Sequence, residues 1–381
     1  VFFRGLDLLN IKRATSHPRA TVYVEQMVDF IKTLEELGYA YDADDGVYFN
    51  IQKFEGYGKL SGMDLSQVEQ TERVAADEYD KENAQDFALW KKATPEEIER
   101  KIYYESPWGY GRPGWHIECS VMSKELLGET IDIHAGGEDL AFPHHENEVA
   151  QSEAANKKQF VRYWVHMRHL LIDGGKMSKS LGNYVTFDEV LEKHSPDAFR
   201  YFYISTHYRR PLNFTWSAME TAENTAKRLE NTLSLAENAL KGGDTNIDYF
   251  EREEKLISAV RTEKRSFIEA MDDDFNTPIA LGHLHNLAGA INEYVLETAN
   301  KGVLTTAYEA YGELLSILGL FEKRNTGGSE VADKLMGFIA ELRQGQRDAK
   351  NWALADEIRD KLKEIGVELK DTPDGATWKF S

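Results

Sequence analysis

The sequence has little of what several protein classes require. It contains a single cysteine, which excludes an internal disulfide framework and favours a reducing compartment. No apolar run approaches the length of a membrane span, so an integral membrane protein is not expected. Lysine and arginine (45) are outnumbered by aspartate and glutamate (65), which gives a net charge of −20. Proteins that bind nucleic acid usually have a basic surface, so composition alone argues mildly against such a partner. A local basic patch on an acidic protein would still be compatible with nucleic-acid binding.

The remaining composition is that of a globular protein. The 381 residues include 41% hydrophobic and 11% aromatic residues, which is ample for several hydrophobic cores. A length of this order suits roughly two to four domains.

One stretch carries a pattern suited to polyphosphate chemistry. Lys176-Met177-Ser178-Lys179-Ser180 follows Asp173-Gly174-Gly175. The glycines supply a hinge, and the two ammonium groups can close over a triphosphate to offset charge on a leaving pyrophosphate. For two lysines alone a solvated basic loop would be the simpler explanation, but the whole string is much less common by chance.

A second stretch could bind a metal. His144 and Glu148 are four residues apart, so on a helix they share one face, and Pro143 is well placed to open that helix. With Cys119 they would supply a thiolate, an imidazole and a carboxylate, a plausible zinc set. Taken singly, each has an ordinary alternative: a buried cysteine, a surface histidine and a glutamate on a helix face.

The strings around these residues resemble a known family. The lysine stretch resembles the KMSKS signature of class I aminoacyl-tRNA synthetases. The second stretch (111–120, 132–140 and 142–148) resembles the zinc-binding core of cysteinyl-tRNA synthetases nearly letter for letter. The resemblance implies an α/β fold: the second half of a Rossmann-like nucleotide-binding domain, then an α-helical bundle and a small C-terminal anticodon-binding domain.

The resemblance also implies a domain order. We expect the following: 1–16, a remnant of the first half of the catalytic domain; 17–111, a connective insertion; 112–170, the second half of the catalytic domain with the zinc site; 171–215, the KMSKS loop and stem-contact region; 216–324, a helical bundle; and 330–381, the anticodon-recognition domain.

Local signals refine this order. Apolar residues repeat at helical spacing from Val24 to Leu34, and a hairpin is expected over 39–49. Residues 63–82 are polar and strongly charged, and we predict that they form an exposed excursion of the chain, that is, a surface segment outside the core. Thr94 and Ser195 are predicted to cap helices, and the segment 195–200 resembles the family's DALR-type segment.

Family members begin with a strand–loop–helix unit that carries a cysteine and the HIGH sequence. Neither occurs here, and the sequence opens at Val1 without an initiator methionine. We therefore expect roughly the first fifth of the natural protein to precede Val1. That segment would supply the fourth zinc ligand, so this chain by itself is expected to be inactive.

Residue roles follow from the resemblance. Cys119, His144 and Glu148 would hold one Zn²⁺ per chain. Trp115 would wall the amino-acid pocket, while His134 and Asp139 would orient the substrate, Asp139 by accepting from its ammonium group. In the lysine loop, Lys179 would contact the ATP phosphates and Lys176 would assist.

The implied reaction has two steps. ATP, accompanied by Mg²⁺, activates L-cysteine to cysteinyl-adenylate, and the acyl group passes to tRNA(Cys). Serine is nearly isosteric with cysteine, and an apolar pocket separates such pairs poorly, whereas zinc selects a thiolate. The family default is a cytoplasmic monomer with no membrane partner.

Three rivals stay open. A cysteine:amino-sugar ligase of mycothiol synthesis shares the zinc pocket and lysine loop but needs no anticodon-binding tail, which the segment from Leu335 to Trp378 resembles. A non-catalytic tRNA-binding paralogue would have no physical need for the three metal ligands. A zinc peptidase is the weakest rival, because the string 144–148 is neither HExxH nor its inversion.

Overall fold

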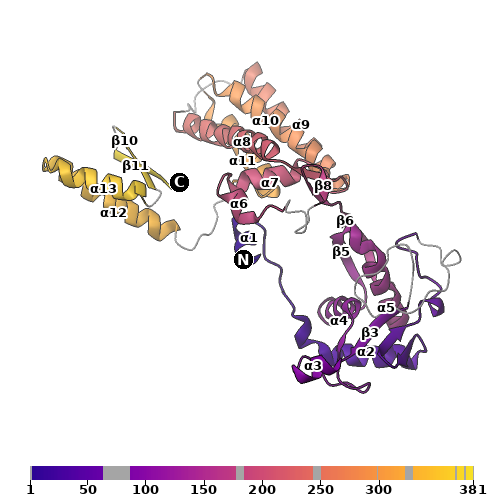
Figure 1. Ribbon diagram of the computed structural model, residues 1–381. Helices are drawn as coiled ribbons and strands as arrows, with labels where there is room; N and C mark the ends of the chain where they lie inside the picture. The colour runs from indigo at the N-terminus through magenta and orange to yellow at the C-terminus, as the bar shows by residue number, and fades with distance from the viewer. Residues whose placement is uncertain are drawn as a thin grey trace. The chain divides into compact units, whose positions relative to one another are not determined.

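The chain forms two units in the computed structural model (Figure 1). One unit comprises Arg13–Leu318, and the other joins Val1–Lys12 to Gly319–Ser381. The structure describes residues 2–62, 86–176, 184–242, 250–297, 299–321, 329–364, 367–372 and 375–380. The excursion expected at 63–82 lies outside them.

The larger unit begins with a helix that covers an antiparallel sheet. Helix α2 (Val24–Glu36) buries six apolar residues at helical spacing, as the sequence predicts. The predicted hairpin is also confirmed, and two further strands extend it in the order β1-β2-β3-β4. The strands are β1 (Ala40–Ala43), β2 (Gly46–Phe49), β3 (Phe87–Lys92) and β4 (Gly111–Pro113). Between β3 and β4, Thr94 forms the predicted capping box at the start of α3 (Pro95–Glu99).

A single hydrophobic core joins this sheet to the two helices that carry the candidate metal ligands. Helix α4 (Trp115–Leu127) contributes Ile117 and Val121, and α5 (Glu146–Asn156) contributes Ala150 and Ala154. They pack with α2, β2 and β3 around a large apolar cluster. The expected boundary near residue 111 therefore falls within one continuous core.

A pair of parallel strands follows α4. Strands β5 (Ile131–Gly137) and β6 (Val161–Met167) pair in register, with α5 between them in sequence. This βαβ unit confirms the α/β class expected from the sequence. Ile131 and Val161 are buried, whereas Ile133 and Tyr163 are 60% and 70% exposed.

The strand pair that leads into the lysine loop is a tight hairpin. Strand β7 (Leu170–Ile172) pairs with β8 (Gly175–Lys176) and, in parallel, with β9 (Leu212–Phe214). Asp173 and Gly174 between β7 and β8 both have positive φ, the combination that a type I′ turn requires. The described chain stops at Lys176 and resumes at 184.

The rest of the larger unit is helical, as expected. Ser195 caps α7 as predicted, and α8 to α11 pack against one another through buried leucine and alanine side chains. The helices are α6 (Phe187–Leu191), α7 (Pro196–Ile204), α8 (Trp216–Gly242), α9 (Glu251–Asp272), α10 (Thr277–Tyr294) and α11 (Lys301–Ile317).

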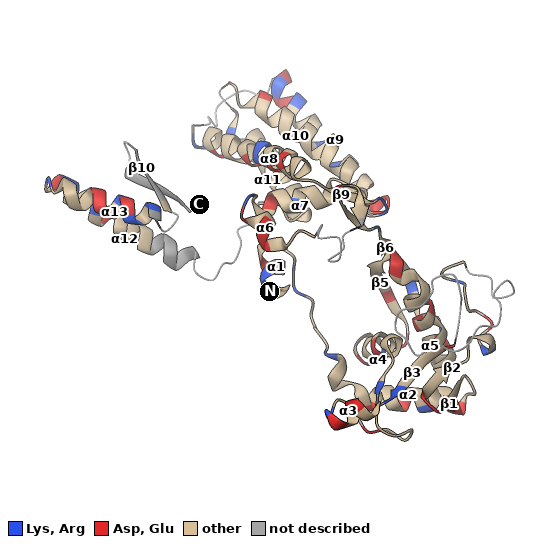
Figure 2. Ribbon diagram, viewed as in Figure 1, with Lys and Arg blue, Asp and Glu red and all other residues tan. Residues whose placement is uncertain are grey.

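The smaller unit contains α1 (Phe2–Leu8), α12 (Ser329–Asp348) and α13 (Trp352–Glu364). Its strands β10 (Val367–Thr372) and β11 (Gly375–Phe380) form an antiparallel hairpin that the sequence did not predict. Met336, Leu362 and Val367 form its buried cluster. Acidic and basic residues alternate along α13 (Figure 2), and pairs such as Lys361–Glu357 bridge successive turns.

None of the helices in the described part of the chain combines the length and apolar composition that crossing a membrane requires.

The core around β2 yields a stability prediction. Phe49 is fully buried, and its ring stacks between Tyr39 and Phe87 at centroid distances of 6.0 and 5.0 Å. Replacing Phe49 by alanine should lower the free energy of unfolding by about 3 to 5 kcal/mol, since it removes buried area and leaves a cavity. Urea denaturation measures this. Val22→Ala, at a side chain that is 69% exposed, is the control and should change little.

Candidate active site

The start of α4 is fixed by a residue without a side chain. A Cβ on Gly114 would lie 1.9 Å from the carbonyl oxygen of Ala88 in β3, so only glycine allows this approach. Helix α4 begins at the next residue, Trp115, and Cys119 follows one turn later. The sheet therefore sets the position of the candidate thiolate ligand.

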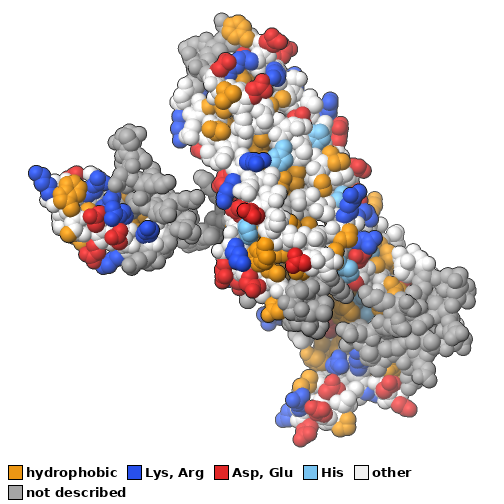
Figure 3. Space-filling view, turned by 45° about the horizontal axis from the view of Figure 1, so that its top comes forward, with side chains coloured by type: hydrophobic (Ala, Val, Ile, Leu, Met, Phe, Trp, Pro, Cys, Tyr) orange, Lys and Arg blue, Asp and Glu red, His pale blue; other side chains and the backbone are white. Residues whose placement is uncertain are grey.

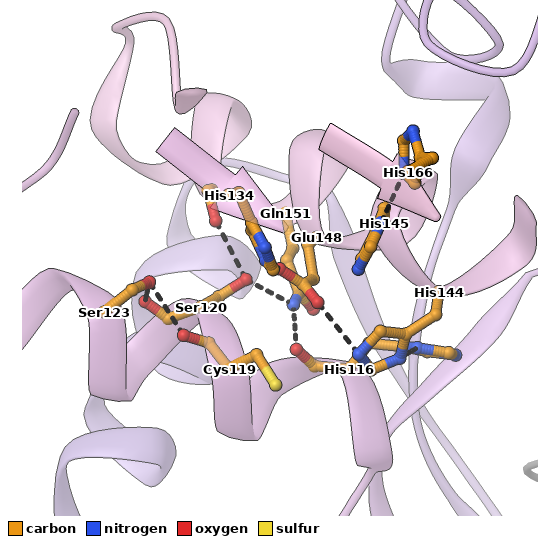
Figure 4. A network of polar contacts seen from close by, with 11 residues as sticks. His116, Cys119, Ser120, Ser123, His134, His144, His145, Glu148, Gln151 and His166 are labelled. Atoms are coloured by element: carbon orange, nitrogen blue, oxygen red, sulfur yellow. Dashed lines mark hydrogen bonds and ion pairs between the residues drawn. The ribbon is translucent and has the colours of Figure 1, made fainter. Parts of the chain in front are cut away.

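The other two candidate ligands lie across the entrance to α5. His144 belongs to an irregular turn, η5 (Ala141–His145), and α5 itself begins at Glu146 rather than directly at Pro143. Glu148 lies in the first turn of α5 and is fully buried. Turn η5 continues directly into α5, and the side chains of His144 and Glu148 both point toward α4 (Figure 4).

The structure brings the three predicted metal ligands together. Ligand atoms of Cys119, His144 and Glu148 all lie within 4.8 Å of one another, and Figure 4 shows the side chains converging from α4, η5 and α5. Glu148 Oε1 is 2.8 Å from His144 Nε2. Among the described residues, however, no donor has hydrogen-bonding geometry with this buried oxygen. A soft thiolate, an imidazole and an oxygen without a donor suit a zinc ion, and a tetrahedral site would need a fourth ligand.

A second imidazole fixes the orientation of His144. His116 Nδ1 lies 2.7 Å from His144 Nδ1, so one ring donates a hydrogen bond to the other. Burial lowers the pKa of His116 to about 3, with the His144 charge as a smaller cause, so His116 is neutral. If His144 Nε2 binds a metal, its proton must sit on Nδ1 and be donated to His116.

Glu148 is ionised although it is buried. Burial alone would raise its pKa, but His134 and His144 outweigh that effect and lower the pKa to about 2. His134 Nε2 is 2.7 Å from Glu148 Oε2. Because a carboxylate can only accept, His134 Nε2 is the donor, and only the neutral form of the ring has an acceptor at Nδ1.

Without a cation, Cys119 stays protonated. Burial, with smaller contributions from the Glu148 and Glu118 charges, raises the pKa of its thiol to about 12. A divalent cation reverses this preference by stabilising the thiolate, so metal binding at this site would release a proton.

An aromatic and imidazole wall borders the site. Trp164 stacks on His134 with ring centroids 4.7 Å apart, and His145 Nδ1 lies 2.8 Å from His166 Nε2. A Cβ on Gly136 would lie 2.6 Å from His145 Cε1, so a larger residue at this strand position would displace the His145 ring. His134, His145 and Glu148 form a second group of side chains that could hold a metal.

The remaining predicted residues are placed as follows. Trp115 is 40% exposed and its ring lies over His144, with centroids 4.1 Å apart. Asp139, in the short helix η4 (Glu138–Leu140), is exposed. Lys176 ends β8, but its side chain, like the whole of Lys179, lies outside the described residues.

Sequence reasoning missed several residues of the site. Gln151 Nε2 donates to the carbonyl of His116 and to Ser120 Oγ, each at 2.7 Å, and so joins α5 to α4. Trp164 and His166 complete the wall. The alternation Trp164-Val165-His166 places both on one face of a strand, which was the available signal. Gln151 lies three residues after Glu148, on the same helix face, but nothing in the sequence identifies its partner.

The buried imidazoles give a pH prediction for the metal-free chain. Burial is the largest cause that lowers the pKa values of His116 and His145, from 6.5 to about 3 and about 4 respectively. Below pH 6.5 the unfolded chain therefore binds protons that the folded chain does not. The free energy of unfolding should therefore decrease as the pH is lowered below 6.5, on the order of 1.4 kcal/mol per pH unit for His116.

Chemical denaturation at several pH values after chelator treatment measures this slope. His116→Gln should flatten this slope between pH 6 and pH 4, whereas His169→Gln, at a histidine whose side chain is 38% exposed, is the control. An unchanged slope in His116→Gln would contradict the assignment.

Comparison with protein families identifies two domains. The model for the "tRNA synthetases class I (C) catalytic domain" matches residues 1–224, and the "DALR domain" model matches residues 266–322. The DALR domain match lies in α9 to α11, C-terminal to the short segment 195–200 whose resemblance to a DALR-type segment stays a prediction.

Similar proteins with known names cover almost the whole chain. The cysteine--tRNA ligase of Thermococcus onnurineus is 45% identical over 383 residues, covering 99% of this chain and 79% of the relative. That of Pyrococcus abyssi is 44% identical over 384 residues, with coverage of 100% and 79%.

Solved structures share the fold at low identity. A Mycobacterium tuberculosis methionyl-tRNA synthetase in complex with methionyl-adenylate has a TM-score of 0.59 at 16% identity, covering 83% of this chain and 75% of that one. A putative arginyl-tRNA synthetase from Campylobacter jejuni has a TM-score of 0.54 at 14% identity, with coverage of 84% and 66%. Together with the family matches, the close relatives show that this chain belongs to the cysteine--tRNA ligase family of class I tRNA synthetases.

Proposed function

We propose that this protein activates L-cysteine with ATP to cysteinyl-adenylate and transfers the acyl group to tRNA(Cys). The observation that carries this proposal is the convergence of Cys119, His144 and Glu148, whose ligand atoms lie within 4.8 Å. A buried thiol beside an ionised carboxylate and an imidazole is a costly arrangement for packing alone. It is well suited to a zinc ion, and the fourth ligand would come from outside the described residues.

The zinc ion would supply a soft Lewis acid that favours the thiol of cysteine over the hydroxyl of serine. The chain's own residues would hold that acid in place. His116 would accept the Nδ1 proton of His144 and keep Nε2 free for ligation. His134 would donate to Glu148 Oε2 and leave Oε1 for the metal. Such selection needs no editing site, because the zinc ion would bind the one atom, sulfur or oxygen, in which cysteine and serine differ.

The substrate's amino group would be held by polar atoms near the wall. Asp139 is exposed and anionic, and so can accept from an ammonium group. In its neutral form, the His134 ring retains an acceptor at Nδ1 after donating to Glu148. Trp115, lying over His144, would exclude water from one side of the pocket.

In the activation step, the cysteine carboxylate attacks the α-phosphate of ATP and pyrophosphate leaves. The protein needs only to position these groups and to stabilise the developing charge. Lys179, with Lys176, would contact the phosphates, and Mg²⁺ would accompany ATP. The type I′ turn at Asp173-Gly174 anchors the start of this loop on β7.

The tRNA partner must be recognised locally. The described surface in the view of Figure 3 carries acidic and basic side chains interspersed rather than separated by sign. We expect the domain at 330–381 to read the anticodon, and we expect the protein to act as a monomer in the cytoplasm, where its single cysteine would stay reduced.

Pyrophosphate exchange tests the chemistry first. The full-length protein should exchange ATP and pyrophosphate in the presence of cysteine and scarcely with serine, because only the thiol becomes a good zinc ligand at neutral pH. Serine thus serves as the matched control substrate. A folded, zinc-loaded protein that supports no exchange with cysteine would favour a non-catalytic tRNA-binding role.

Cys119→Ser tests the ligand set in the full-length protein. Zinc content and the rate of cysteine-dependent exchange should fall together, because serine is a harder and less acidic ligand. Ser123→Ala, one turn along α4 with its hydroxyl bonded to helix carbonyls, is the control. If both quantities stayed at the wild-type level, Cys119 would not be a ligand.

Lys179→Ala tests the lysine loop. Adenylate formation should slow by about a hundredfold or more, since the lysine would act on charge that develops in the transition state. Equilibrium cysteine binding should stay near wild type. Weaker cysteine binding with an unchanged rate would reverse the proposed role.

A further inference from the structure

Two residues between His144 and Glu148 in sequence make their hydrogen bonds to a loop far earlier in the chain. Glu146 is fully buried and its carboxylate accepts four hydrogen bonds from one loop of the chain. The amide of Gly58 donates to Oε1 at 2.9 Å. The amides of Leu60 and Ser61 and the Ser61 hydroxyl donate to Oε2 at 3.1, 2.7 and 2.8 Å.

Asn147 binds the same loop. It is 1% exposed, and its Oδ1 accepts a hydrogen bond of 2.6 Å from the hydroxyl of Tyr57. Leu60 of this loop packs on the cluster formed by Ile131, Val149, Phe160 and Val161, which Trp164 also contacts. The loop therefore supports both α5 and the wall of the pocket.

The helix period places the loop contacts of Glu146 on the side of α5 opposite Glu148. Residues two apart on an α-helix point about 200° apart, so within α5 Glu146 faces away from Glu148. On the ligand side, Gln151 ties α5 to α4. Helix α5 is thus held from two faces, and its rotation about its own axis is fixed.

We propose that Glu146 and Asn147 are positioning residues that set the rotation and register of α5, and thereby the approach of His144 and Glu148 to Cys119. This inference rests on the proposed zinc site. Metal sites tolerate errors of only about 0.2 Å in ligand distance, so a small rotation of α5 would weaken binding without unfolding the protein.

The charge of Glu146 matters as well as its shape. A carboxylate offers only acceptors, which matches four donors converging from the loop. In Glu146→Gln one acceptor atom becomes an amide group that faces an N–H donor, so at least one buried donor loses its partner. The loop must then shift or rotate the helix.

The experiment compares Co²⁺ binding in full-length variants by competition with a chelator, and records the visible absorption of the bound Co²⁺. Glu146→Gln should weaken binding by about tenfold and change the absorption spectrum. Tyr57→Phe removes only the hydroxyl that Asn147 accepts and should act in the same direction with a smaller effect. Glu55→Gln, at an exposed side chain two residues before Tyr57, is the control and should match the wild type.

Thermal unfolding checks that each variant is folded at the temperature of the measurement. Folded Glu146→Gln with wild-type affinity and spectrum would overturn the proposal. If Glu146→Gln does not fold, Tyr57→Phe decides, and unchanged Co²⁺ binding in that variant would equally overturn it. Absence of Co²⁺ binding in the wild type would instead reject the zinc site on which the inference rests.

Discussion

The ionised carboxylate of Glu148, buried completely in the interior, is the constraint around which this part of the protein is organised. A buried charge is tolerated only when other groups compensate for it. Here His134 donates to one oxygen, and the other faces His144 and the thiol of Cys119. Removing the carboxylate would therefore disturb two imidazoles and a thiol as well as the helix that carries it.

The surrounding architecture keeps this charge in place with polar contacts as well as apolar packing. Helices α4 and α5 share the core of the antiparallel sheet, yet Gln151 joins them through hydrogen bonds to His116 and Ser120. Hydrogen bonds are directional, so they specify one relative placement of the helices where apolar contacts would accept several. The uncommon number of buried polar side chains on α5 follows from this requirement.

Local structure and ligand identity could be predicted from the sequence, because both depend on short spacings. The helix at Val24, the hairpin after it and the caps at Thr94 and Ser195 are each encoded within a few residues. The C-terminal hairpin was not predicted, although apolar and polar residues alternate over Val367–Lys370 and Asp374-Gly375 is a turn signal. The partners of Glu146 lie 85 to 88 residues earlier in the chain, and no local pattern reveals such a distant contact.

The parallel strands β5 and β6 have a consequence for the handling of this chain. In the described structure each is an edge strand with unpaired backbone groups, and Ile133 and Tyr163 are largely exposed on them. Such edges are templates for intermolecular strand pairing. Asp132 and Arg162, adjacent in sequence to these residues and 3.3 Å apart, act as charged gatekeepers against that pairing. Because Ile133 and Tyr163 stay largely exposed beside these charges, aggregation of the isolated chain should begin at this sheet.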